Sequence, residues 1–126
     1  MERYLGPYAE AIYALFRAVF GFLFSCHGMQ KILGLFGGGP PTMTPLSWAA
    51  GAIELVAGAM IAVGFRASPA AFLASGTMAV AYFMVHQPMG LLPIQNRGEL
   101  AVVYCFGFLW IAAKGSGSPS VDDARR

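Results

Sequence analysis

The sequence has few charged residues. Asp, Glu, Lys and Arg make up 11% of its 126 residues, whereas a water-soluble domain of this size carries about 25%. Hydrophobic residues make up 57%, and the mean hydropathy is +0.61. This composition argues against a water-soluble domain and predicts a membrane protein.

Cysteine is also scarce. The two cysteines, Cys26 and Cys105, both lie inside apolar segments, and no CxxC pair is present. A structural disulfide, a zinc site and a thioredoxin-like redox pair therefore have no support in the sequence. We interpret both cysteines as small hydrophobic residues and predict no metal site.

Two further features are absent. The net charge is only +2 and no basic stripe occurs, which argues against nucleic-acid binding. A cleavable signal peptide also fits poorly, because Glu10 and Arg17 interrupt the first apolar run, which is much longer than a signal sequence. We therefore expect the first apolar segment to be a retained helix.

The chain does contain apolar segments, each close in length to the roughly 17–25 residues that a membrane-spanning helix needs. Thr44 with Pro45 and Ser68 with Pro69 are typical of helix starts, and Pro88 stops the third segment. We predict a single all-α domain, an integral membrane four-helix transmembrane bundle with a short tail at 115–126. The predicted helices cover residues 9–35, 46–64, 70–87 and 98–114.

Lys and Arg residues predict how the bundle is oriented. With four spans, the termini and the second-to-third connection lie on one side, and most positive charges lie there. The positive-inside rule then places both termini in the cytoplasm. The residues on that side are Arg3, Arg66, Lys114, Arg125 and Arg126, against Lys31 and Arg97 on the other.

Several ionisable residues interrupt the apolar segments, where each costs about 2.5–3.5 kcal/mol on insertion scales. At about 1.5 Å per residue, His27 lies some 27 Å from the start of the first helix, and Glu54 lies about 12 Å below the opposite surface. Each of the four helices thus contributes an ionisable side chain to the same half of the bundle, the half away from the termini. The predicted ligand-binding or proton-handling residues are His27, Lys31, Glu54, His86 and Glu99.

Alternatives to a ligand site remain open. Glu54 and Glu99 could instead neutralise Lys31 and Arg97 in a structural network, although buried ion pairs stabilise weakly for their cost. Two histidines on separate helices could also hold a haem iron as axial ligands. A single possible pair is a weak signal, however, and we do not predict a haem. Arg17 lies too far from this cluster, and we expect it to pair across helices or with a backbone carbonyl.

Five blocks, in this order, resemble the DoxX family of small four-helix membrane proteins. The first two are "FRAVFGFLFSCHGMQK" (16–31) and "GAIELVAGAMIAVGFR" (51–66). "AVAYFMVH" (79–86), "RGELAVVY" (97–104) and the tail block "GSGSPSVDD" (115–123) follow. The resemblance covers nearly the whole chain.

The resemblance implies a fold and also indicates what related proteins do. The family takes its name from subunits associated with a thiosulfate:quinone oxidoreductase, and other relatives look like chaperones or trafficking factors. It suggests a bacterial or archaeal plasma membrane, and it leaves open whether the chain is an enzyme, so no catalytic residue is assigned.

Two hypotheses follow. The first is a quinone-interacting membrane subunit with no cofactor of its own, whose electrons come from a protein partner carrying redox cofactors. The second is a non-catalytic accessory subunit with a structural polar core. A transporter is disfavoured, because the sequence shows no broken-helix pair or inverted repeat.

Overall fold

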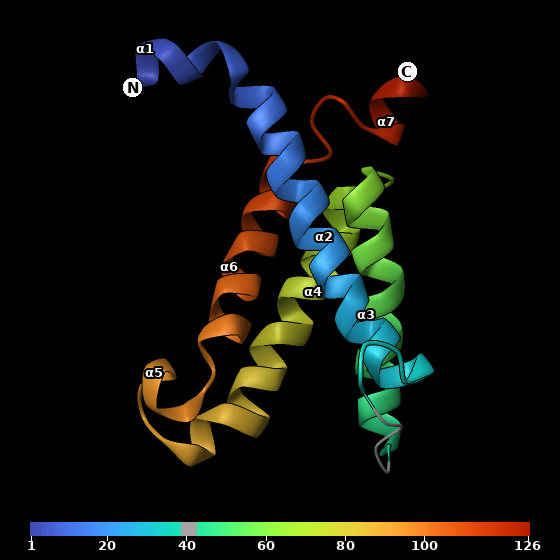
Figure 1. Ribbon diagram of the computed structural model, residues 1–126, viewed down its shortest axis with the longest axis vertical. Helices are drawn as coiled ribbons and strands as arrows, with labels where there is room; N and C mark the ends of the chain where they lie inside the picture. The colour runs from blue at the N-terminus through green and yellow to red at the C-terminus, as the bar shows by residue number, and fades with distance from the viewer. Residues whose placement is uncertain (39–42) are drawn as a thin grey trace.

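The computed structural model describes residues 1–38 and 43–126, and this part of the chain is helical with no strand. The predicted all-α class is therefore confirmed. The long helices are α2 (Ala9–Leu33), α3 (Pro45–Val63), α4 (Ala67–Ala81) and α6 (Glu99–Lys114) (Figure 1). The short elements are α1 (Glu2–Leu5), η1 (Gly6–Tyr8), the π-helical turn η2 (Tyr82–His86), η3 (Gln87–Met89), α5 (Pro93–Asn96) and α7 (Val121–Ala124).

The long helices carry apolar side chains on their outer faces. Phe22 is 58% exposed, Phe72 69% and Phe106 66%, a pattern typical of a surface that contacts lipid. The fourth long helix, α6, has 16 residues, a rise of about 24 Å. Within the described residues, the segments long and apolar enough to cross a membrane are Glu2–Leu33, Pro45–Val63 and Ala67–Met89.

Helix boundaries follow local chemistry and differ from expectation at some ends. The α-helix α4 ends at Ala81 and not at residue 87, because the π-helical turn η2 follows it, and α2 ends at Leu33 and not at residue 35. Thr44 Oγ1 accepts a hydrogen bond from Ser47 N at 3.2 Å and caps α3. The next helix, α4, begins at Ala67 and not at residue 70, because Ser68 does not cap it but donates to Ala112 O at 2.7 Å. Pro69 then lies in the first turn, where its missing N–H leaves no bond unmade.

Helices α2 and α3 meet backbone to backbone along a seam of glycines. A Cβ on Gly58 would lie 2.6 Å from Ser25 N and 2.8 Å from Gly21 O. A Cβ on Gly28 would overlap the backbone N of Leu55 and lie 2.7 Å from Gly51 O. Only glycine permits this approach, which provides close packing where lipid offers no hydrophobic driving force.

Helices α4 and α6 form the second pair, packed through small residues. Ala67, Ala71 and Ala74 are fully buried. Ser75 Oγ donates to Cys105 O at 2.7 Å and so joins the two helices. The pair therefore packs tightly without glycines.

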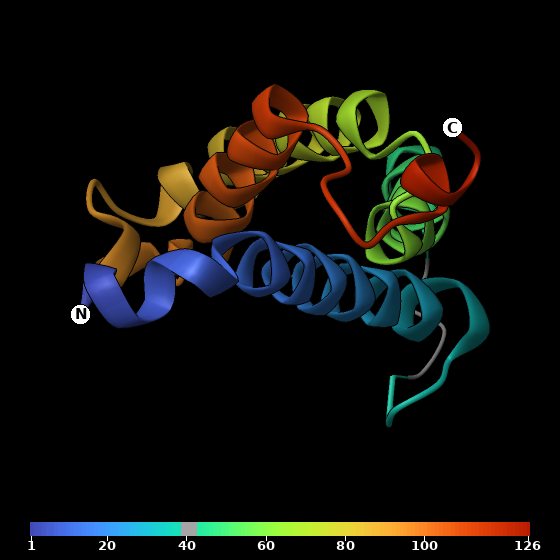
Figure 2. The ribbon, with the colours of Figure 1, turned by 90° about the horizontal axis from the view of Figure 1, so that it is seen from above.

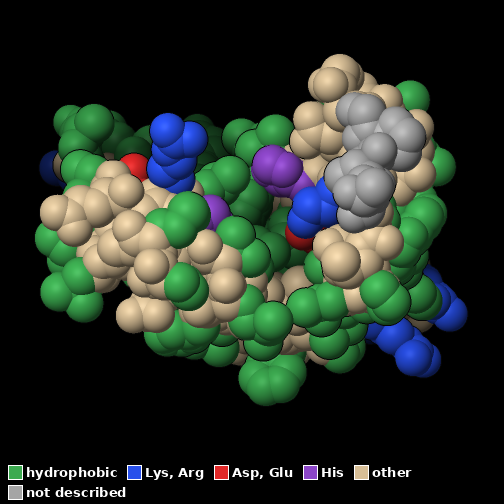
Figure 3. All heavy atoms as spheres, turned by 90° about the horizontal axis from the view of Figure 1, so that it is seen from below, with side chains coloured by type: hydrophobic (Ala, Val, Ile, Leu, Met, Phe, Trp, Pro, Cys, Tyr) green, Lys and Arg blue, Asp and Glu red, His purple; other side chains and the backbone are tan. Residues whose placement is uncertain are grey.

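The two pairs lie together at the end that carries both termini and diverge toward the other end (Figures 1 and 2). We call these the terminal end and the loop end. Aromatic rings fill the space between α2 and α6, with centroids 5.1 Å apart for Tyr13 and Trp110 and 4.7 Å apart for Phe24 and Phe108. Seen from the loop end, the bundle is hollowed between the pairs (Figure 3).

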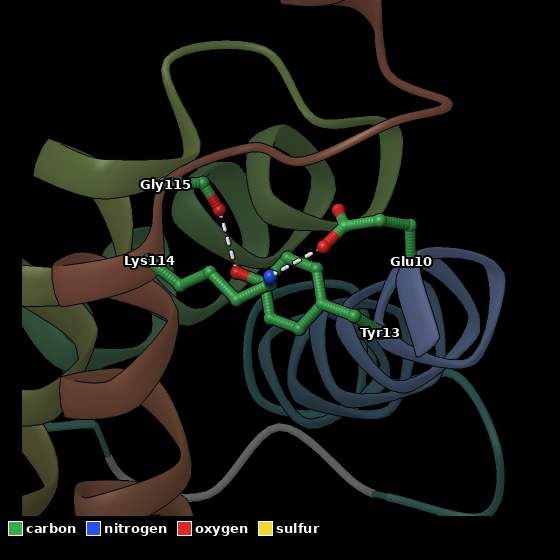
Figure 4. A network of polar contacts seen from close by, with 4 residues as sticks. All are labelled: Glu10, Tyr13, Lys114 and Gly115. Atoms are coloured by element: carbon green, nitrogen blue, oxygen red, sulfur yellow. Dashed lines mark hydrogen bonds and ion pairs between the residues drawn. The ribbon is translucent and has the colours of Figure 1, made fainter. Parts of the chain in front are cut away.

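The C-terminal tail closes the terminal end. The Tyr13 hydroxyl donates a hydrogen bond to Gly115 O at 2.5 Å, and Lys114 forms an ion pair with Glu10 at 2.8 Å (Figure 4). A Cβ on Gly117 would lie 2.7 Å from the Tyr13 ring. The tail therefore lies directly on α2.

Arg17 joins the tail to the bundle. It is 3% exposed and donates to three backbone carbonyls, those of Ile61 at 2.7 Å, Ala62 at 2.9 Å and Pro119 at 2.8 Å. Of the two partners that the sequence left open for Arg17, the structure therefore shows the backbone carbonyl. Arg17 therefore has a structural role, because it joins α2, α3 and the tail at the terminal end.

Asp122 holds the tail to the α3–α4 turn. Its Oδ2 accepts from Ser116 Oγ at 2.5 Å and from Arg66 N at 2.8 Å, while its N–H donates to Gly64 O at 3.0 Å. The Ser116 hydroxyl first and the Arg66 N–H second lower the pKa of Asp122. The carboxylate is thus the form that the attached tail favours.

The glycine seam can be tested with a matched pair of substitutions. Gly28→Ala should destabilise the protein by about 1–3 kcal/mol, because its methyl group meets backbone that cannot move aside. Gly76→Ala should be neutral or stabilising, because a Cβ there meets no atom within 4 Å. Unfolding of both variants in one detergent measures the difference, and equal stability would contradict the seam.

Tail attachment should depend on pH. Because the pKa of Asp122 is lowered in the folded protein, the attachment is fully present above the ordinary pKa of about 4. It should be lost as the pH falls through the lowered value. Hydrogen exchange of tail amides, corrected for intrinsic rates, should rise in that range, and Asp122→Asn should show fast exchange at every pH. A pH response that persists in Asp122→Asn would assign it to another group.

Candidate ligand-binding cavity

The cavity lies between the two helix pairs toward the loop end and has a volume of about 820 Å³. All four long helices contribute to its wall. Figure 3 shows the hollow from the loop end, with histidine side chains and an adjacent pair of opposite charges at its edge. The ionisable residues that line it are His27, Lys31, Glu54, His86 and Arg97.

An ion pair across the glycine seam forms the polar end of the cavity. Lys31 Nζ on α2 lies 2.5 Å from Glu54 Oε1 on α3. The Lys31 side chain is 39% exposed, whereas that of Glu54 is 2% exposed. Among the residues that the structure describes, no donor reaches the other carboxylate oxygen, Oε2, which is shielded from solvent. Lys31 is therefore the accessible member of this pair, and both residues line the cavity.

His27 and Tyr104 lie beside this pair. The two rings meet edge to face, with centroids 6.1 Å apart, and Tyr104 also packs against Phe24 at 5.4 Å. Tyr104 is 4% exposed and lines the cavity. Its phenol can donate one hydrogen bond and its ring fixes the position of that donor.

A second polar group lies near the loop end, organised by the buried Asn96. Asn96 donates to Gly90 O at 2.9 Å and to the Tyr82 hydroxyl at 3.2 Å. His86 Nδ1 lies 3.1 Å from Asn96 O. Because a carbonyl only accepts, Nδ1 is the donor in this contact. Arg97, in a left-handed conformation with φ 58°, follows directly and lines the same cavity.

The remaining wall is apolar and lies between α3 and α4. Leu46 and Ile53 line it from α3, and Phe72, Leu73 and Val80 line it from α4. The cavity therefore joins charged and hydrogen-bonding groups to an apolar surface.

Four of the five residues predicted for the site line this one cavity: His27, Lys31, Glu54 and His86. Glu99 does not. It is exposed in the first turn of α6, where a carboxylate interacts favourably with the positive end of the helix dipole. Sequence reasoning missed Tyr104, because an aromatic residue in an apolar helix carries no signal that separates a cavity wall from a lipid-facing surface.

Comparison with known proteins identifies the family. The DoxX family model matches residues 12–87. A similar chain is an uncharacterised protein of Haemophilus influenzae, 33% identical over an alignment of 126 positions that includes 94% of each chain. No solved structure matches. The resemblance noted in the sequence is thereby confirmed, and this chain belongs to the DoxX family of membrane proteins.

Proposed function

We propose that this protein binds a membrane-soluble quinone and serves as a membrane subunit of an oxidoreductase complex. The observation that carries the proposal is one cavity that joins the Lys31–Glu54 pair to the apolar gap between α3 and α4. A quinone has the same division, with a polar head and a long hydrocarbon tail.

The size of the cavity fits such a ligand. Its volume of about 820 Å³ falls in the range of roughly 300–1,000 Å³ typical of small-molecule sites. Such sites are mostly apolar with a few fixed polar groups. Here the polar groups in the wall include Lys31 and Tyr104.

The chemistry of those groups suits the head. Quinone oxygens accept hydrogen bonds, and the Lys31 ammonium and the Tyr104 hydroxyl are donors. His27 and His86 also line the cavity and belong to the residue type that most often transfers protons in proteins, and reduction of a quinone consumes protons. The protein would therefore hold the head and supply protons, while a partner with redox cofactors supplies electrons, as the family resemblance implies.

One observation favours a different function. The Lys31–Glu54 pair links α2 to α3, so these residues could fix helix register in an accessory subunit that binds no quinone. Stability and ligand content separate the two functions.

The double variant Lys31→Met/Glu54→Gln removes both charges without stranding either one. If the cavity holds a quinone, solvent extraction of the purified wild-type protein should recover it, and the variant should retain at least fivefold less. Replacing a buried pair with neutral groups of similar volume is often close to neutral for stability. We therefore expect similar unfolding temperatures.

A second ion pair in the chain provides the matched control. Lys114 and Glu10 lie at the terminal end with side chains 32% and 62% exposed, so Lys114→Met/Glu10→Gln should keep both quinone and stability. Full quinone content in the cavity variant, together with a lower unfolding temperature, would assign the pair to the structural function.

We further propose that the terminal end faces the cytoplasm, because most Lys and Arg residues flank that end. The test uses single cysteines in a Cys26→Ser/Cys105→Ser background. Gln95→Cys at the loop end should react with a membrane-impermeant maleimide in intact cells, and Ala124→Cys only after permeabilisation. The reverse labelling would overturn this orientation.

A further inference from the structure

The cavity wall between α3 and α4 is open toward the outside of the bundle. Gly76 on α4 lines the cavity and is exposed, and a Cβ added there would meet no atom within 4 Å. Phe72 and Val80, one helical turn to either side, are 69% and 51% exposed. The opposite rim includes Leu46 on α3, which is 55% exposed.

Hydroxyl groups in this wall make internal hydrogen bonds. Thr77 donates to Leu73 O at 2.9 Å in its own helix, and Ser47 bonds to Thr44 Oγ1 at 3.0 Å. The wall therefore offers a hydrocarbon-like surface. Along α4 and the following turn η2 it extends from Phe72 to Val85, about 20 Å at the rise of a helix.

The opposite side of the cavity is filled. Between α2 and α6, Tyr104 packs against Phe20 at 5.6 Å and against Phe24 at 5.4 Å. A Cβ on Gly107 would overlap the Phe20 ring. Among residues 1–38 and 43–126, the lateral opening to the polar end is therefore on the α3–α4 side, at Gly76.

We propose that this gap, which we call the Gly76 groove and which Phe72, Gly76 and Val80 of α4 and Leu46 and Ala49 of α3 delimit, holds the hydrocarbon tail of the ligand. The ligand is then a long-tailed lipid that reaches Lys31 sideways from the bilayer, with its tail left in the groove. This inference rests on the proposed function, since it assigns a place to the tail of the same molecule.

A pair of probes separates tail from head. One is a benzoquinone with a decyl substituent, and the other has the same head with a methyl group in place of the decyl chain. Both are titrated against the protein in lipid nanodiscs by quenching of its intrinsic fluorescence. Gly76→Leu fills the groove, and we expect it to weaken decylquinone binding about tenfold or more with little change for the methyl compound.

The matched control is Val56→Leu. Val56 is 58% exposed on α3 and lies outside the cavity wall, so both probes should bind this variant as they bind the wild type. Ala49→Leu narrows the groove from the α3 rim and replaces Gly76→Leu if that variant misfolds. Each probe is compared between variants and not with the other probe, because decylquinone also partitions into the nanodisc lipid.

Two results overturn the inference. One is wild-type affinity for decylquinone in both rim variants, and the other is a parallel loss for both probes in Gly76→Leu. Absence of decylquinone binding to the wild-type protein would contradict the proposed function itself, and is therefore a distinct outcome.

Discussion

The backbone contact between α2 and α3 is the constraint on which the rest of the structure depends. At Gly28 and Gly58 no side chain separates the two helices, so their relative rotation and register are fixed. Lys31 is three residues beyond Gly28 and Glu54 is four residues before Gly58, which places the ion pair directly across this seam. A larger residue in the seam would move apart the two groups that form the polar end of the cavity.

The other interfaces differ from the seam, and that difference produces the cavity. Small residues join α4 to α6, whereas rings such as Phe24 and Phe108 keep α2 apart from α6. The tail holds the pairs together at the terminal end through Arg17 and Asp122, and among the residues that the structure describes no such hydrogen-bonded segment joins them at the loop end. The pairs therefore diverge with distance from the tail, and Lys31 and His86 line the cavity that lies between them.

Much of this organisation could be predicted from the sequence, because apolar length and proline positions determine where membrane helices begin and end. The grouping of His27, Lys31, Glu54 and His86 followed from depth alone. The rotation of a helix about its own axis could not be predicted in the same way. Helix α6 is apolar on all sides, and nothing in its sequence pattern indicates which face packs inward. For this reason Glu99 was expected in the cluster and Tyr104 was not. The attachment of the tail depends on contacts between residues 56 positions apart, as for Arg66 and Asp122, which no local pattern encodes.

The arrangement of the cavity also indicates where binding energy for a lipid ligand must come from. A hydrocarbon tail gains little by leaving the bilayer for an apolar groove, because lipid chains are as apolar as the groove. Polar contacts must then supply most of the affinity, and these lie at Lys31, His27 and Tyr104. In the proposed binding mode, the Gly76 groove sets the position of the ligand, since it would let the head group reach those donors while the tail stays in an environment as apolar as lipid. A long-tailed ligand would thus need both features, the exposed Gly76 in the apolar wall for its tail and the Lys31–Glu54 pair inside the bundle for its head.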